Sequence, residues 1–487
     1  MENGIRRHPP KSSGSMVWTQ KTQYAEKDMS DNHQDKKSAP GSNAELLTKI
    51  TAQFHKAHQF GDHNAYIYLA KNAALAQAKA LVGNDPTKSP LYGMTLAIKD
   101  NIEVAGMTHS VGHKSLEHYI PASDADVVAQ LKKAGAIING KTNMHELALG
   151  ITSNNGAFGP VKNAYNASCF AGGSSGGTAT AIALGLADAG IGTDTGGSTR
   201  IPAALNGIVG FRPTTGRYSS RGISLLSQTR DTAGPMAANV ETVALLDSVM
   251  AQEPAVNVNP YPLYKLRLGM PKAYFFDNIS PEITDRLEKI ISKLQAAGVQ
   301  WVDVDLSDVA QLSHQSSFTI VLYEARQQLE NLLKRAAPQL SFEQFVSQTS
   351  SPDVKALLTM LLEDPIADDA YHEAIDTLRP KLQKAYKDCF ESHQLDALIF
   401  PATPLPAQPI LGSDETVYLN GQQVSTFSTF IQNTDPSSNA GIPSLVIPMG
   451  LNSGGLPIAL QIDGPAGSDQ HLLAIGASIE NMLKTKL

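Results

Sequence analysis

Cysteine is scarce in this sequence: only Cys169 and Cys389 occur in 487 residues. Two distant cysteines exclude a disulfide framework and a metal site built from cysteines, and they are typical of a reduced, cytoplasmic protein. Long hydrophobic runs are missing too, since no run approaches the length of about 18 apolar residues that a membrane-spanning helix needs. The sequence therefore predicts a protein that does not cross a membrane.

A surplus of positive charge is also absent. Lys and Arg together number 39 against 46 Asp and Glu, which gives a formal net charge of −7. Electrostatic binding to nucleic acid or to an anionic membrane surface calls for the opposite balance. We therefore expect neither of them as the main partner.

The composition is that of a folded protein, with 42% hydrophobic and 17% charged residues. At about 150 residues per domain, the length allows about three domains or one large α/β domain. Residues 1–42 differ from the rest, because they are rich in Lys, Asp, Gln, Ser and His and lack the apolar segment of a secretory signal. We expect a disordered tail over 1–42 and a folded domain over 43–487.

The order of the predicted elements indicates an α/β fold. Apolar residues recur every three or four positions over 43–81, which predicts amphipathic helices. Residues 93–101 contain a short apolar run, and we expect a strand that places Lys99 at its carboxyl end. A helix over 124–134 and a buried strand at 136–138 follow. Helices that alternate with strands predict a layered α/β architecture.

The second half of the chain predicts a covering layer and further strands. Residues 260–395 are predicted to be mostly helical and to cover the core. The apolar runs at 395–400 and 444–448 predict two strands. The polar stretch 412–421 predicts a loop between them.

Residues 135–142 fit the P-loop pattern G-x-x-x-x-G-K-T to the letter. A P-loop needs a strand before the first glycine and a helix after the threonine, so that backbone N–H groups surround a phosphate. Here the apolar segment lies between the two glycines, and a predicted helix precedes the first. Gly135 is better explained as a helix C-cap, and a P-loop nucleotide-binding protein is the alternative from a different class.

Residues 172–176, Gly-Gly-Ser-Ser-Gly, contain the G-x-S-x-G pattern of the α/β-hydrolase nucleophile elbow. That elbow requires a buried strand directly before it, and the preceding residues 163–170, which contain two asparagines, are a poor strand. A flexible linker is the simplest alternative for a glycine- and serine-rich cluster. A second cluster at close range weakens that alternative.

Residues 192–200, Gly-Thr-Asp-Thr-Gly-Gly-Ser-Thr-Arg, are the second cluster. Its glycines allow backbone N–H groups to turn inward around Ser198, as an oxyanion hole requires. A serine hydroxyl needs a base, and no histidine lies near either cluster in sequence. Lys99 is the nearest candidate, because burial lowers the pKa of a lysine and leaves it neutral; a surface or ion-pair role beside Asp100 is the alternative.

Taken together, these motifs resemble the amidase signature family. The resemblance is densest over 93–236 and extends over almost the whole chain from residue 43. It rests on the segments 93–101, 172–177, 192–200, 202–204, 213–217, 231–236 and 439–443. The family implies one large α/β domain with a central mixed sheet flanked by helices.

The resemblance also implies the roles of individual residues. It makes Ser198 the acylated nucleophile, Ser174 the bridging serine with a cis peptide bond before it, and Lys99 the ultimate base. The oxyanion hole would consist of the backbone N–H groups of Thr195, Gly196, Gly197 and Ser198. Asp194 and Arg200 are expected to brace the loop. Neither a metal nor an organic cofactor is implied.

Three segments resemble indoleacetamide and mandelamide hydrolases in particular: 210–218, 229–232 and 141–147. They favour hydrolysis of a small primary amide with an aryl or hydrophobic acyl group. The sequence does not indicate the oligomeric state, and a homodimer is an expectation only because homodimers occur in the family. The alternative within the family is the A subunit of a tRNA-dependent amidotransferase, which releases ammonia from glutamine. Its typical Ser-Ser-Asn-Leu and Tyr-Asp-Gly have no match at 317–325. A catalytically inactive relative is a further alternative.

Three other residues suggest chemistry but are expected to be structural. His145 and Tyr323 are candidates for substrate contact, and a structural role is at least as well supported for both. Cys169 lies close to Ser174 in sequence, and we expect it to pack in the core.

Overall fold

An eleven-stranded mixed sheet organises the computed structural model, which describes residues 43–81, 88–254, 258 and 261–484. The predicted tail over 1–42 lies outside the described residues, and residues 43–487 form one unit. The strand order is β1-β3-β2-β6-β8-β7-β14-β15-β11-β9-β10. The strands are β1 (Tyr66–Leu69), β2 (Thr95–Lys99), β3 (Ile137–Thr142), β6 (Ala189–Asp194), β7 (Val209–Arg212), β8 (Thr232–Ala237), β9 (Arg267–Pro271), β10 (Gln300–Val304), β11 (Ala397–Pro401), β14 (Ser444–Leu451) and β15 (Pro457–Asp463).

Parallel and antiparallel pairs share this sheet. Strand β2 runs parallel to both β3 and β6, and β9 runs parallel to β10 and β11. The centre is antiparallel, with β8 between β6 and β7 and with β14 between β7 and β15. Two short hairpins lie outside the sheet: β4 (Asn154–Asn155) with β5 (Gly159–Pro160), and β12 (Thr416–Leu419) with β13 (Gln422–Ser425).

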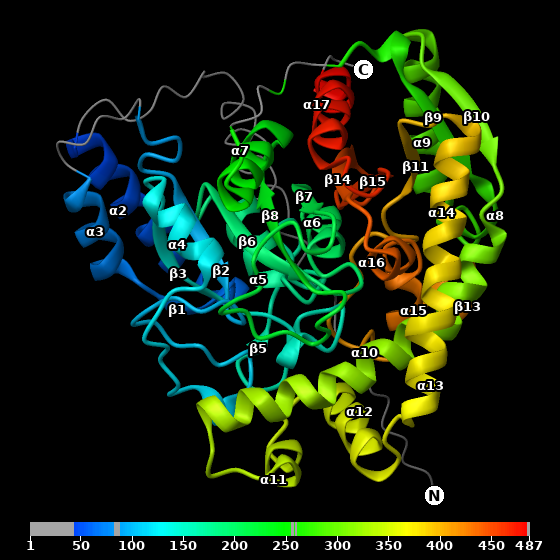
Figure 1. The fold of residues 1–487 in the computed structure, drawn as a ribbon. Coiled ribbons are helices and arrows are strands. Elements are labelled where there is room, and N and C mark those ends of the chain that lie inside the picture. The colour runs from blue at the N-terminus through cyan, green and yellow to red at the C-terminus, as the bar shows by residue number, and fades with distance from the viewer. Residues whose placement is uncertain (1–42, 82–87, 255–257, 259–260, 485–487) are drawn as a thin grey trace, which may run out of the picture. The chain divides into compact units, whose positions relative to one another are not determined.

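Helices cover both faces of the sheet (Figure 1). Alternate side chains of a strand point to opposite faces, and on β15 Leu460 and Ile462 join one hydrophobic cluster while Ala459 joins another. The first cluster includes α4 (Asp126–Lys133), α7 (Val240–Ala251), α9 (Pro281–Ala296) and α17 (Asp469–Lys484), and the second includes α5 (Gly176–Ala183) and α6 (Arg200–Leu205). This arrangement confirms the predicted mixed sheet flanked by helices.

The remaining helices lie at the two ends and along one side of this core. Helices α2 (Asn43–Gln59) and α3 (Lys71–Ala80) pack against β3, and α14 (Arg379–His393) packs against β11. Figure 1 shows the long α10 (Ser307–Ala336) below the sheet, together with α11 (Phe342–Ser347) and α12 (Pro352–Glu363). The shorter helices are α8 (Lys272–Phe275), α13 (Asp368–His372), α15 (Thr426–Ile431) and α16 (Asp435–Ala440).

Several strands were not predicted from the sequence. Strand β1 lies within the stretch predicted to be helical, and β9 and β10 add two parallel strands to the section predicted to be a mostly helical cover. The loop predicted over 412–421 contains most of the β12–β13 hairpin instead. Its turn residues Asn420 and Gly421 both have positive φ, at 51° and 81°, which is the Asn-Gly hairpin signal that the prediction missed.

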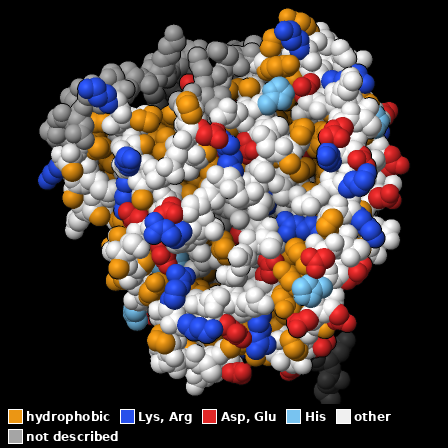
Figure 2. Space-filling model, viewed as in Figure 1, with side chains coloured by type: hydrophobic (Ala, Val, Ile, Leu, Met, Phe, Trp, Pro, Cys, Tyr) orange, Lys and Arg blue, Asp and Glu red, His pale blue; other side chains and the backbone are white. Residues whose placement is uncertain are grey.

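Surface charge of both signs is interspersed over the face that Figure 2 shows, and Lys and Arg form no continuous field there. Among the described residues, no helix is both long and apolar enough to cross a membrane.

Close packing at the start of α5 yields a stability prediction. A Cβ atom on Gly177 would lie 2.3 Å from the Asn143 carbonyl oxygen and 2.4 Å from that of Ala65. Both obstacles are backbone atoms, so Gly177→Ala is expected to lower the free energy of unfolding by about 1–3 kcal/mol or more. Urea denaturation measures this change. Gly61→Ala, where a Cβ meets no atom within 4 Å, is the matched control, and equal stabilities for the two variants would contradict the prediction.

Candidate active site

Three neighbouring segments place the predicted site residues. Strand β2 ends at Lys99, beside the parallel β6, which ends at Asp194. The loop that carries Ser174 leads into α5, which packs against both strands. The loop after β6 carries Ser198 and leads into α6. The carboxyl ends of parallel strands meet at one edge of a sheet, so Lys99 and the Ser198 loop come from this edge, and the Ser174 loop lies against Lys99.

Lys99 is fully buried at the centre of this edge. Its Nζ lies 2.7 Å from Ser174 Oγ and 2.8 Å from Thr193 Oγ1. Burial lowers the pKa of Lys99 to about 7, against the opposing attraction of the Asp231 and Asp194 carboxylates. A substantial fraction of Lys99 is therefore neutral near pH 7 and has a lone pair available to accept a proton.

The peptide bond between Gly173 and Ser174 is cis. The Ser174 carbonyl accepts a hydrogen bond from the His145 backbone N–H at 3.1 Å. The next residue connects the two serine loops, because the Ser175 N–H donates to the Ser198 carbonyl at 3.1 Å. The structure thus joins Lys99 to Ser174 directly and brings the Ser198 loop against the same segment.

The loop over 195–198 is held from its outer side by Thr434, which precedes α16. The Thr434 hydroxyl donates to the Gly196 carbonyl at 2.7 Å, so that carbonyl points away from the loop interior. Gly197 has φ +139°, and a Cβ there would lie 2.2 Å from Thr434 Oγ1. Glycine is therefore required at this position both for its conformation and for the close approach of the threonine.

Asp194 lies between two buried arginines. Its Oδ1 accepts from Arg200 Nη2 and from Arg212 Nη1, both at 3.0 Å, and its Oδ2 accepts from Arg200 Nε at 3.0 Å. Burial alone raises the pKa of Asp194, but attraction to the two guanidiniums outweighs it and keeps that pKa well below its usual range. The Thr199 N–H also donates to Oδ2. These bonds brace the loop at both ends, as predicted for Asp194 and Arg200.

Sequence reasoning missed several residues of this site. Thr193 holds the Lys99 amine, Arg212 completes the arginine pair, and Asp231 is the carboxylate with the largest attraction for Lys99. Thr193 and Asp231 lie in segments that carried the family resemblance, and Arg212 lies in the segment 210–218 that resembled indoleacetamide and mandelamide hydrolases. Only the glycines, serines and Lys99 had an evident chemical function in the sequence, so the polar partners around them went unrecognised.

The residues expected to be structural make structural contacts. His145 Nε2 lies 3.0 Å from Asp353 Oδ2. The Tyr323 ring stacks on Tyr371 with centroids 4.0 Å apart. Cys169 is buried in a hydrophobic cluster with Phe170 and Phe430, so it packs in the core.

The P-loop alternative fails on geometry. Lys141 is a fully buried residue of β3, and its Nζ donates to Asp100 Oδ1 at 3.1 Å and to the Thr108 carbonyl at 2.9 Å. Its amine is thus occupied inside the protein, and residues 137–142 form a strand rather than a loop around a phosphate. Among the described residues, no group of three His, Cys, Asp or Glu could hold a metal ion.

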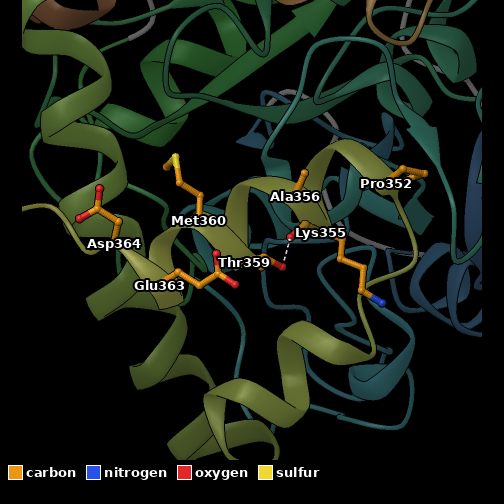
Figure 3. Close-up of a pocket in the computed structure, with 7 residues that line it drawn as sticks. All are labelled: Pro352, Lys355, Ala356, Thr359, Met360, Glu363 and Asp364. Carbon is orange, nitrogen blue, oxygen red and sulfur yellow. Dashed lines mark hydrogen bonds between the residues drawn. The ribbon is translucent and has the colours of Figure 1, made fainter.

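A surface pocket lies on one face of α12, away from the strand ends of the site (Figure 3). It is lined by Pro352, Lys355, Ala356, Thr359, Met360, Glu363 and Asp364. These side chains are exposed or half-buried and include no serine. The lysine and serines near the ends of β2 and β6 are therefore a better candidate for the active site than this pocket.

Comparisons with known proteins agree with this geometry. Residues 45–473 match the Amidase family. Indoleacetamide hydrolase of Agrobacterium vitis is 42% identical over 394 residues, covering 81% of this chain and 84% of that protein. Mandelamide hydrolase of Pseudomonas putida is 39% identical over 463 residues, covering 89% and 87%. A crystal structure of an amidase superimposes with a TM-score of 0.79 at 33% identity, covering 94% of this chain and 99% of that one.

The fold and these relatives define an amide-hydrolysing enzyme. The chain belongs to the Amidase family, and its fold is that of the solved amidases.

Removal of the carboxylate between the two arginines is expected to destabilise the protein strongly. Asp194→Asn leaves two buried guanidiniums without their shared counter-charge, which lowers the free energy of unfolding by about 3–5 kcal/mol. Asp303→Asn is the matched control, because Asp303 pairs with Lys272 on the exposed surface and contributes about 1 kcal/mol or less. Chemical denaturation of both variants measures the difference. Similar losses in the two would show that the buried cluster is not the brace described above.

Proposed function

We propose that the protein is a serine amidohydrolase in which Lys99, Ser174 and Ser198 form the proton relay and the nucleophile. The observation that carries this proposal is the 2.7 Å contact between Lys99 Nζ and Ser174 Oγ in a fully buried setting. A lysine whose pKa is about 7 can act as a general base near neutral pH.

Acylation follows from these positions. Neutral Lys99 accepts the Ser174 hydroxyl proton while Ser174 Oγ accepts the proton of Ser198. Ser198 Oγ then bonds to the amide carbon, and the carbonyl oxygen becomes an oxyanion. The N–H groups of Thr195, Gly196, Gly197 and Ser198 stabilise that oxyanion, with each well-aligned donor contributing about 3 kcal/mol.

Collapse of the tetrahedral intermediate breaks the C–N bond. The proton held by Lys99 returns through Ser174 to the nitrogen, so ammonia leaves instead of an amide anion. The product is an ester on Ser198. Water then loses a proton to the same relay and attacks the ester carbon, and the relay returns that proton to Ser198 as the C–O bond breaks. The carboxylic acid that leaves gives up its remaining proton to solvent and becomes the carboxylate.

The substrate proposed is a small primary amide with an aryl acyl group. The relatives named for indoleacetamide and mandelamide support this class. Apolar side chains beside the loop over 195–198, called here the oxyanion loop, also support this substrate class. Ile431 lies against the loop, since a Cβ atom on Gly196 would be 2.9 Å from Ile431 Cδ1. Phe427 lies one turn earlier on α15 and packs edge-to-face against Phe318, whose side chain remains partly exposed.

Glutamine suits this surface less well than an aryl group. Its ammonium and carboxylate need charged or polar partners, whereas Ile431 and the two phenylalanines offer none. The polar groups of the nearby α10 segment have partners within the protein. Ser317 Oγ bonds to Asp435, and Glu324 accepts from Ser227 and Thr229.

The expectation that the protein forms a homodimer stays a prediction.

Substrate class is tested by ammonia release from indole-3-acetamide, mandelamide, phenylacetamide, a short aliphatic amide and glutamine. We expect turnover of the aryl amides by the protein alone and its loss in Ser198→Ala, because that variant lacks the attacking oxygen. Cys169→Ala is the control and should keep both fold and activity. Activity on glutamine only would instead favour the amidotransferase subunit, and a fully active Ser198→Ala would remove the assigned nucleophile.

The role of Lys99 predicts a pH profile. Because the base must be neutral, kcat/KM for an aryl amide should rise as pH increases through about 7 and level off above it. Lys99→Met should reduce kcat by about 10²–10⁴-fold while the protein stays folded, as thermal unfolding would verify. A rate that is independent of pH across the neutral range would contradict this assignment.

A further inference from the structure

Asp231 lies directly beside the oxyanion loop. Strands β6 and β8 are antiparallel, with Asp194 opposite Thr232, so the residue before β8 continues the register opposite Thr195. Lys99, Ser174 and Asp194 have no exposed surface, whereas Ser198, Thr195 and Asp231 retain 7%, 8% and 8%. Asp231 therefore shares the slight exposure of Thr195 and Ser198, unlike the fully buried Lys99 and Ser174.

The two carboxylate oxygens of Asp231 differ in their surroundings. Oδ2 accepts from the Leu226 backbone N–H at 2.6 Å, and the Ser227 N–H also bonds to the carboxylate. Oδ1 is buried and has no hydrogen-bond partner among the described residues. The Thr195 hydroxyl lies near enough to lower the pKa of the carboxyl but is not placed for a hydrogen bond to Oδ1.

A buried acceptor without a partner is costly, and at a functional site it indicates a group that a ligand supplies. Asp194 provides the contrast, because both of its oxygens are occupied by arginines. A primary amide brings two N–H donors to the site, and the relay uses neither of them, because it delivers a proton to the nitrogen lone pair. Esters of the same acid bring none.

We propose that Asp231 Oδ1 accepts a hydrogen bond from the substrate's carboxamide nitrogen and so selects primary amides over esters. This inference rests on the proposed function. The bond orients the nitrogen so that its developing lone pair faces Ser174 Oγ, which delivers the proton, and it remains in place until ammonia departs. Asp231 is thus a substrate-contacting residue that determines leaving-group specificity.

The charge state of Asp231 is suited to this role. Burial raises the pKa of its carboxyl to about 6, and the nearby Thr195 hydroxyl together with the Leu226 and Ser227 N–H groups opposes that shift. The carboxylate form, which can only accept, therefore predominates above about pH 6, and so over the range around pH 7 in which Lys99 becomes neutral.

Asp231→Asn tests the proposal because the two backbone N–H groups fix the orientation of the new amide. They require the Asn oxygen at the Oδ2 position, which places the NH2 group where Oδ1 was and replaces an acceptor with a donor. We expect kcat/KM for indole-3-acetamide to fall about 10- to 100-fold. Hydrolysis of methyl indole-3-acetate should change less than about threefold, since its leaving oxygen has no N–H.

Asp463→Asn is the matched control. Asp463 is also a buried carboxylate with one occupied and one unpartnered oxygen, and burial raises its pKa to about 6 as well. It ends β15, beneath the braced loop, so this variant should change amide and ester hydrolysis by the same factor. A fall in the amide-to-ester ratio confined to Asp231→Asn supports the proposal. An unchanged ratio in that variant overturns it, even if both activities fall, because that result describes a structural role.

A wild-type measurement serves if Asp231→Asn does not fold. Lys99 and Arg212 are the charged groups that act on Asp231. The ionisation of Lys99 in the free enzyme affects both substrates and cancels in the ratio of their kcat/KM values. Protonation of Asp231 removes the acceptor, so the amide-to-ester ratio should fall as pH drops through about 6, and a constant ratio overturns the proposal. A wild type that hydrolyses neither substrate nor any other amide would instead overturn the proposed function itself.

Discussion

The Asp194 carboxylate, held between Arg200 and Arg212, is the interaction on which the site depends. A glycine-rich loop has little conformational preference of its own, because glycine loses more backbone entropy on ordering than any other residue. The loop over 195–198 therefore needs external restraint. Asp194 supplies it at one end, Arg200 carries the restraint across to Thr434 and to serines of α16, and Thr434 fixes the Gly196 carbonyl.

The same cluster influences Lys99. A lysine buried this deeply would lose its charge entirely if desolvation acted alone, and it would keep its charge if a bare carboxylate lay next to it. Here the Asp194 charge is shared with two guanidiniums, and Asp231 provides the larger opposing attraction. The balance leaves the pKa of Lys99 near 7. The braces of the loop and the basicity of the lysine are thus two consequences of one set of buried charges.

The location of the candidate site was largely predictable from the sequence, because its residues are concentrated in short segments. A strand ending in Lys99 and two glycine- and serine-rich loops carry their signals locally, and their proximity follows from the sheet topology. The substrate side was not predictable in this way. Ile431 of α15 and Thr434 before α16 reach the loop over 195–198 from more than 100 residues away, and Phe318 of α10 packs against Phe427 of α15. Nothing in their local sequence distinguishes these residues from other core or helix residues. Asp231 was missed because its proposed role depends on a carboxylate oxygen that has no hydrogen-bond partner, and a sequence gives no sign of a missing partner.

Strand prediction failed for a related reason. Edge strands such as β1 and β10 are short and only partly buried, so their apolar periodicity is weak and the neighbouring helices dominate the pattern. These strands extend the sheet at its two edges. The helices of the second half deliver the aromatic and aliphatic groups that lie near the loop over 195–198. This division of the site, between groups at strand ends and groups from distant helices, has a chemical reason. Bond cleavage needs groups fixed to within fractions of an ångström, which adjacent strand ends provide. Recognition of an apolar acyl group needs only shape and hydrophobic area, which helices distant in sequence can supply.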